Sequence, residues 1–169
     1  MTKIATTKPF LSAVLMSDAT SLVPDYNYAV VSVKEAADTT YKLGQVVVYN
    51  GTDAYRVLKN ADFTSDSVLT APAGIPSLPN GSAWGVVVGF DSLGGEFDAT
   101  VGATARKAYV LFRGPVGVKD THTDGGLVFD AGVVAARKAT IKRLMEQEGL
   151  DVKAVAAQTE ASLYGYRSY

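Results

Sequence analysis

One histidine and two nearby aspartates form the most chemically suggestive cluster in the sequence. His122 is the single histidine of the chain, and it stands between Asp120 and Asp124. In an extended segment, side chains two positions apart point to the same side, so these three could offer nitrogen and oxygen ligands to zinc or another metal. The spacing supplies no fourth ligand, and a pair of glycines follows directly. We therefore interpret 120–124 as a polar loop and expect no metal site.

The other reactive residue types lack the neighbours that catalysis requires. The sequence contains no cysteine, which removes thiolate nucleophiles, thiolate metal sites and disulfides. Its glycines match neither a phosphate-binding loop nor a dinucleotide fingerprint, and no serine lies in a G-x-S-x-G turn. Glu96 and Asp98 are close in sequence, but nothing indicates the apolar pocket in which one of them could act as a general acid. We expect no catalytic residue, no cofactor and no enzymatic activity.

The charge balance argues against nucleic-acid and membrane partners. The 169-residue chain has a formal net charge of -1, whereas nucleic-acid binding calls for a basic face. The basic stretch at 137–143 is soon followed by acidic residues, so a solvated helix face is the default interpretation. No apolar run approaches the ~18 residues of a membrane span, and the interrupted N-terminus does not indicate a signal peptide. The absence of cysteine fits synthesis in a reducing cytoplasm.

Residues 25–150 predict a mainly β domain, a barrel-like α+β fold. The strongest local signal is a hairpin, in which Asn50-Gly51 joins the apolar runs 45–49 and 54–58. Residues 34–40 are expected to form a polar turn. β-branched and aromatic residues predict further strands at 28–33, 84–90, 97–101, 107–112, 116–118 and 127–129.

A long loop and one peripheral helix complete the expected domain. The loop covers 60–82 and contains three of the six prolines, which exclude a central strand. The helix is expected near 130–148, with Asp130 as the N-cap and Gly149 as the left-handed residue that ends it. Apolar residues recur within it at helical spacing, at Val134, Ile141, Leu144 and Met145.

Both termini are expected to lie outside this domain. Residues 1–24 read as an extended N-terminal arm, rich in threonine and serine, with an apolar cluster at 10–16. Two interpretations stay open: the arm packs on its own domain, or it becomes ordered only against a partner. Residues 151–169 read as a C-terminal extension. Its residues Tyr164, Tyr166, Arg167 and Tyr169 are of types enriched at protein interfaces, so we take them as candidate subunit-interface residues. Packing of this tail on its own domain is the alternative.

Several short motifs follow one another in a distinctive order. Residues 107–116 read KAYVLFRGPV, residues 127–130 read LVFD, and an Ala/Arg/Lys helix then ends at Gly149-Leu150. Earlier, KLGQVV, YRVL and WGVV stand at 42–47, 55–58 and 84–87. Together these motifs resemble the phage head decoration proteins of the lambda D type over roughly residues 40–150. The long proline loop and the C-terminal extension depart from the pattern of that family.

The resemblance implies a structural function. A decoration protein of this type is a small β-barrel-like fold with a peripheral helix. It assembles as a homotrimer on the outer capsid surface of the virion and stabilises the head. The resemblance also implies that the N-terminal arm docks on the major capsid protein. We expect residues 2–16 to carry this contact, and the candidate capsid-binding residues are Ile4, Phe10, Leu11 and Val14.

Two other functions stay open at this point. The first is a trimeric β binding module at the tail or fibre base of a virion, which would share the composition and the lack of catalytic groups. The second is an enzyme or a small-ligand carrier that uses a barrel mouth near Trp84 and Tyr109. A ligand site needs convergent polar groups, and the sequence does not indicate them.

Overall fold

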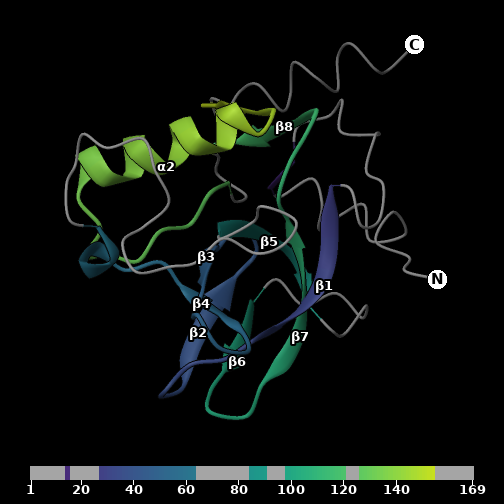
Figure 1. Cartoon of the computed structure of the whole chain (residues 1–169), viewed down its shortest axis with the longest axis vertical. Coiled ribbons are helices and arrows are strands. Elements are labelled where there is room, and N and C mark those ends of the chain that lie inside the picture. The colour runs from purple at the N-terminus through teal and green to yellow at the C-terminus, as the bar shows by residue number, and fades with distance from the viewer. Residues whose placement is uncertain (1–13, 16–26, 64–83, 91–97, 121–125, 155–169) are drawn as a thin grey trace.

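The structure, a computed structural model, describes residues 14–15, 27–63, 84–90, 98–120 and 126–154. Within these ranges the fold is mainly β, as the sequence predicts (Figure 1). The strands are β1 (Tyr28–Val33), β2 (Thr39–Lys42), β3 (Val46–Tyr49), β4 (Tyr55–Val57), β5 (Trp84–Phe90), β6 (Asp98–Val101), β7 (Arg106–Leu111), β8 (Val116–Lys119) and β9 (Leu150–Lys153). A 3-10 helix, η2 (Asn60–Asp62), follows β4, and the α-helix α2 (Ala135–Gln147) precedes β9.

Five strands close into a barrel in the order β1-β4-β3-β5-β7. Neighbouring strands are antiparallel except β1 and β4, which are parallel and meet at Val33 and Tyr55. β3 consists of three valines and a tyrosine, and all three valines are 0% exposed, so this strand is covered on both faces. Aliphatic and aromatic side chains of these strands belong to the buried core, as expected for a barrel of so few strands.

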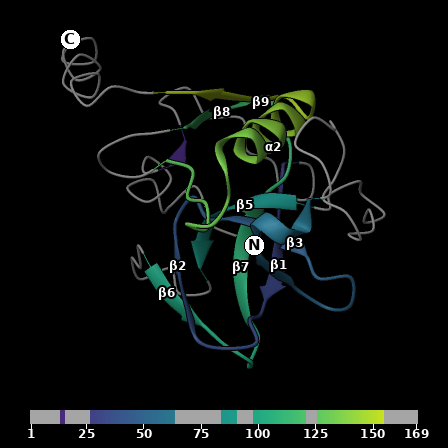
Figure 2. The same cartoon turned by 90° about the vertical axis from the view of Figure 1, so that its left-hand side faces the viewer.

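Two small sheets extend the barrel. β2 pairs with β6 in an antiparallel sheet, and β8 pairs with β9 in a parallel one. α2 connects β8 to β9 and packs beside them at one end of the barrel, at the top of both views (Figures 1 and 2). The helix buries Ile141, Leu144 and Met145 in the core shared with the barrel. The β8–β9 sheet extends to Lys153.

The predicted hairpin is confirmed as β3 and β4, but its loop is longer than Asn50-Gly51. The N–H of Asn50 donates to the carbonyl of Ala54 at 2.8 Å, so three residues lie between them. The Asn50 side-chain oxygen accepts the N–H groups of Thr52 and Asp53 at 2.7 and 3.0 Å. The asparagine thus organises the loop through its side chain, as asparagines commonly do in turns.

The predicted start of the helix is wrong. Asp130 is not its N-cap, because α2 begins at Ala135 and its N-cap residue is Val134. The Asp130 carboxylate instead accepts the N–H of Gly132 at 3.2 Å, and its carbonyl accepts the N–H of Val133 at 3.0 Å. These bonds form a turn before the helix. The predicted end is confirmed, since Gly149 follows the helix with φ of 89°.

Three further predictions differ from the structure in detail. The expected turn at 34–40 overlaps β2, which begins at Thr39. The expected strand at 127–129 is reduced to one isolated bridge between Gln45 and Val128. The start of the proline loop forms η2, and its remaining residues 64–82 lie outside the described ranges.

Gly44 brings two distant segments into contact where only glycine fits. Its φ is 91°, which side-chain-bearing residues rarely adopt. Its N–H donates to the carbonyl of Val87 at 2.7 Å, and its carbonyl accepts the N–H of Val128 at 2.8 Å. A Cβ atom at this position would lie 1.9 Å from the carbonyl oxygen of Gly126. Any side chain would therefore push the 126–128 segment away from the barrel.

We predict that Gly44→Ala destabilises the domain by at least about 2 kcal/mol, because it combines an unfavourable φ with a backbone clash. The matched control is Gly132→Ala, since a Cβ there meets only the Asp130 side chain at 3.3 Å. Urea unfolding of both variants measures the difference. Equal free energies of unfolding would contradict the role assigned to Gly44.

Candidate functional site

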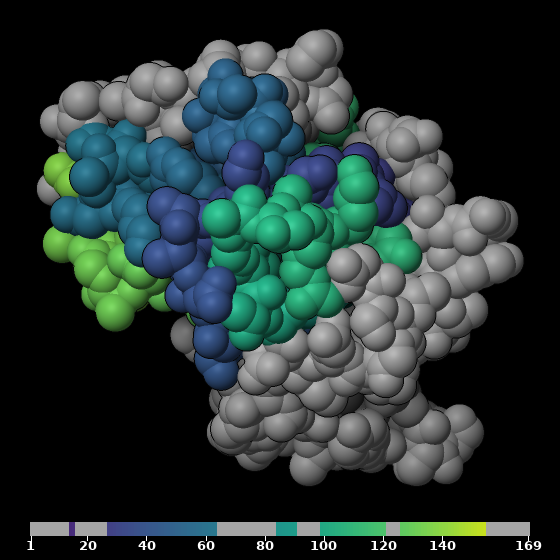
Figure 3. Space-filling model, turned by 90° about the horizontal axis from the view of Figure 1, so that it is seen from below, coloured from purple at the N-terminus to yellow at the C-terminus, as the bar shows by residue number. Residues whose placement is uncertain are grey.

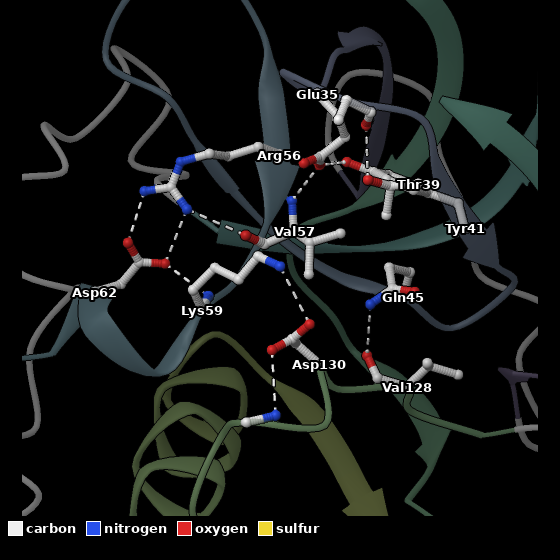
Figure 4. A network of polar contacts seen from close by, with 12 residues as sticks. Glu35, Thr39, Tyr41, Gln45, Arg56, Val57, Lys59, Asp62, Val128 and Asp130 are labelled. Carbon is white, nitrogen blue, oxygen red and sulfur yellow. Dashed lines mark hydrogen bonds and ion pairs between the residues drawn. The ribbon is translucent and has the colours of Figure 1, made fainter. Parts of the chain in front are cut away.

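An ion pair between Arg56 and Asp62 is the centre of the polar contacts beside the barrel (Figure 4). The guanidinium reaches both carboxylate oxygens, at 2.9 and 2.6 Å. The same carboxylate accepts the N–H of Lys59 at 2.7 Å. Arg56 lies on β4 and Asp62 ends η2, so the pair fixes η2 against the barrel. The Asp62 side chain is only 10% exposed, and such a carboxylate needs these donors to offset its loss of hydration.

Glu35 is the second hub of this network. Its carboxylate accepts the N–H of Val57 at 2.8 Å and the hydroxyl of Tyr41. Glu35 follows β1, Tyr41 lies on β2 and Val57 lies on β4, so one side chain joins three strands. Burial, together with the hydrogen bond to Glu35, raises the pKa of Tyr41 far above its ordinary value near 10. Burial likewise raises the pKa of Tyr55.

Residues 59–60 connect this network to the start of α2. The Lys59 ammonium lies 3.2 Å from the Asp130 carboxylate. The side-chain oxygen of Asn60 accepts the N–H of Val134, the N-cap residue of α2, at 3.2 Å. The Asn60 carbonyl in turn accepts a hydrogen bond from the Arg137 guanidinium. A residue 74 positions away thus takes the place of a local helix cap.

The hydrogen bonds of this network join separate elements of the fold. The carboxylates of Glu35 and Asp62 each accept hydrogen bonds from more than one element. The raised pKa keeps the Tyr41 phenol protonated at alkaline pH, where an exposed tyrosine would ionise. Groups held in this way stabilise one arrangement of strands. The network therefore makes the barrel and the base of the helix one rigid unit.

The outer wall of the barrel carries an exposed apolar side chain on β1. Val30 on β1 lies opposite Tyr109 on β7, and Val30 is 45% exposed. The Tyr109 ring covers Gly89 of β5 and meets Tyr28 edge-on at 6.4 Å. Figure 3 views another face, on which blue residues of 27–63 and green residues of 98–120 adjoin without a break.

The structure places some of the predicted site residues. Val14 is 0% exposed within the core of its own domain, so in this conformation its side chain is not available to a capsid. Of the other candidate residues, Ile4, Phe10, Leu11, Tyr164, Tyr166, Arg167 and Tyr169 lie outside the described ranges. The roles predicted for them stay predictions.

The predicted polar loop is described only at its first residue. The Asp120 carboxylate lies 2.9 Å from the Lys142 ammonium of α2. His122 and Asp124 lie outside the described ranges. Within those ranges, no three histidine, cysteine or carboxylate side chains form a group that could hold a metal ion.

Sequence reasoning missed the network residues Glu35, Tyr41, Arg56, Asn60 and Asp62. Alternation along 54–58 puts Arg56 on the opposite face from its apolar neighbours, which is the only local signal for any of them. Its partner Asp62 falls in a segment interpreted as loop, and no motif joins the two.

Comparison of the chain with protein-family models, with curated proteins and with solved structures finds no match. Among the described residues, no helix combines the length and the apolar character needed to cross a membrane.

We predict that Asp62→Ala lowers the free energy of unfolding by about 2–3 kcal/mol, because it leaves Arg56 and the Lys59 N–H without this acceptor. Lys34→Ala is the control, since it removes the exposed pair with Asp53 and should cost less than about 1 kcal/mol. Urea unfolding compares the two variants. A loss as small for Asp62→Ala as for the control would contradict the central position of this pair.

The raised pKa values of Tyr41 and Tyr55 predict alkaline unfolding. The folded state holds these protons to higher pH than the unfolded chain does, so stability is intact below the ordinary pKa near 10 and falls as pH rises beyond it. In an ultraviolet titration of the nine tyrosines, at least two should ionise only as circular dichroism reports loss of the fold. Tyr41→Phe should lower that late-ionising number by one. Ionisation of all nine near pH 10 with the fold intact would refute this prediction.

Proposed function

We propose that this chain is a structural decoration protein, which binds the outer surface of a phage capsid as a homotrimer and stabilises the head. The proposal rests first on the sequence resemblance to the lambda D type. Its partners would be other copies of itself and the major capsid protein. Its place would be the outside of the virion.

The structural observation that best supports the proposal is a contact between two parts of the chain. The resemblance depends on two separate motifs, the Arg-Gly-Pro element after β7 and the glycine that ends α2. In the fold these glycines meet: the N–H of Gly114 donates to the carbonyl of Glu148 at 2.8 Å. A Cβ on Gly114 would lie 2.1 Å from the Gly149 carbonyl oxygen. The two motifs are therefore parts of one packing arrangement, which supports their interpretation as a linked family pattern.

The rigidity of the body is consistent with this function. A protein that clamps its neighbours must present the same surface before and after binding, since ordering a loose surface weakens the association. The closed barrel and the Glu35 and Arg56 contacts provide such a body. Association of three copies would then multiply weak capsid contacts into avidity.

The small-ligand alternative gains no support from the barrel. Buried aliphatic and aromatic side chains form the core of the domain, and β5 beside the expected mouth is almost wholly buried. A β module at the tail or fibre base has no observation in its favour over the capsid. It differs from the main proposal in where the protein binds on the particle.

The test uses the purified chain and undecorated capsids assembled from the major capsid protein of the same phage. Light scattering should give about three times the 17.8 kDa chain mass, and capsids should bind the protein to a fixed stoichiometry. A chain lacking residues 2–13 should remain trimeric but lose decoration. A chain lacking residues 163–169 is the complementary variant and should lose the trimer. An inert monomer, or labelling of tails instead of heads, would overturn the proposal.

A further inference from the structure

Two residues of the N-terminal segment are held tightly by the body. Val14 and Leu15 are 0% and 2% exposed and belong to the hydrophobic core. Leu15 forms an antiparallel bridge with Val118 of β8. Val118 also pairs with Val152 of β9, so Leu15 lies on the opposite edge of β8. The segment thus adds a third strand position to the β8–β9 sheet.

The seat for these residues is apolar and part of the folded body. β8 is buried along its whole length, and Val116 and Val118 are 4% and 0% exposed. An exposed strand edge readily accepts another extended segment, because its N–H and C=O groups are unpaired. Val14 and Leu15 cover this edge at Val118.

The residues that cover this edge of β8 belong to the same chain as β8. Asn27, where the described chain resumes, donates from its side chain to the carbonyls of Arg113 and Gly114, just before β8. Gly114 and Val118 are four residues apart, a span of at most about 14 Å. The eleven residues 16–26 could reach roughly 36–40 Å if extended. Both ends of this connection are therefore fixed within easy reach, which gives an effective concentration in the millimolar range, far above that of a second copy in solution.

We infer that Val14 and Leu15 form a latch, which holds the N-terminal segment on the edge of β8 and stays closed when the protein binds its partner. Val14 is then a positioning residue. The existence of the latch is independent of the proposed function. The statement that the latch stays closed on binding rests on that function.

A pair of cysteines tests the latch directly, because the natural chain has none. Opposite residues of an antiparallel bridge have Cα atoms about 4.5–5.5 Å apart, within the range of a disulfide. The double variant Leu15→Cys, Val118→Cys should form a bond within one chain on mild oxidation. Leu15→Cys with Val152→Cys spans two strand spacings, about 9.5 Å, and should not. Failure to form the first bond, or covalent oligomers in its place, would overturn the latch.

The oxidised variant then tests whether the latch stays closed. Oxidised and reduced forms should decorate undecorated capsids within twofold of each other. Loss of decoration on oxidation alone would mean that Val14 must leave its seat, and would overturn the inference. If neither these forms nor the unaltered chain binds to capsids, the proposed function is wrong. The latch is then tested by formation of the crosslink alone.

Limited proteolysis of the unaltered chain gives a second measurement, free of any folding defect in the cysteine variants. Cleavage in the N-terminal segment should leave fragments that begin at or before Val14. Val14→Ser with Leu15→Ser should move cleavage to any position before Asn27. Trimming of the unaltered chain beyond Leu15 while the barrel remains folded would contradict the latch.

Discussion

Closure of the barrel between β1 and β4 is the contact on which the rest of the structure depends. These parallel strands meet at one pair, Val33 and Tyr55, and the N–H of Lys34 adds a hydrogen bond to the Tyr55 carbonyl at 3.0 Å. After this pair, the link to β4 is made by a side chain, because the Glu35 carboxylate accepts the N–H of Val57 at 2.8 Å. A side chain thus adds to the short strand pairing at the seam.

Polar contacts link β4 to η2 and η2 to the start of α2. β4 leads into η2, which is fixed by the Arg56–Asp62 pair and in turn holds the first residues of α2. The other end of α2 returns to the barrel where Gly149 meets Gly114. The helix is therefore held at both ends by the body that it covers. Surfaces supported in this way keep their shape on binding, which lowers the entropic cost of association.

The sequence predicts the elements that neighbouring residues determine and misses those that distant residues determine. β1 and β5 coincide with the strands expected at 28–33 and 84–90, because β-branched and aromatic residues predominate in both segments. The helix begins later than expected after Asp130, because Asn60 supplies its cap from 74 positions away. The polar network was beyond prediction for the same reason. Its donors and acceptors lie just after β1, on β2 and β4, and at η2 and the residue before it, and no short motif joins them.

The barrel order also determines when the chain can fold during its synthesis. β1 is among the first strands to leave the ribosome, yet its main partner is β7, with Val33 paired to Arg106. About 70 residues separate the two, which at ~5–20 residues per second means a delay of several seconds. Until then β1 has an unpaired edge and apolar side chains open to misassociation with other nascent chains. Early termination of translation before β7 would leave a fragment that lacks one strand of the closed barrel.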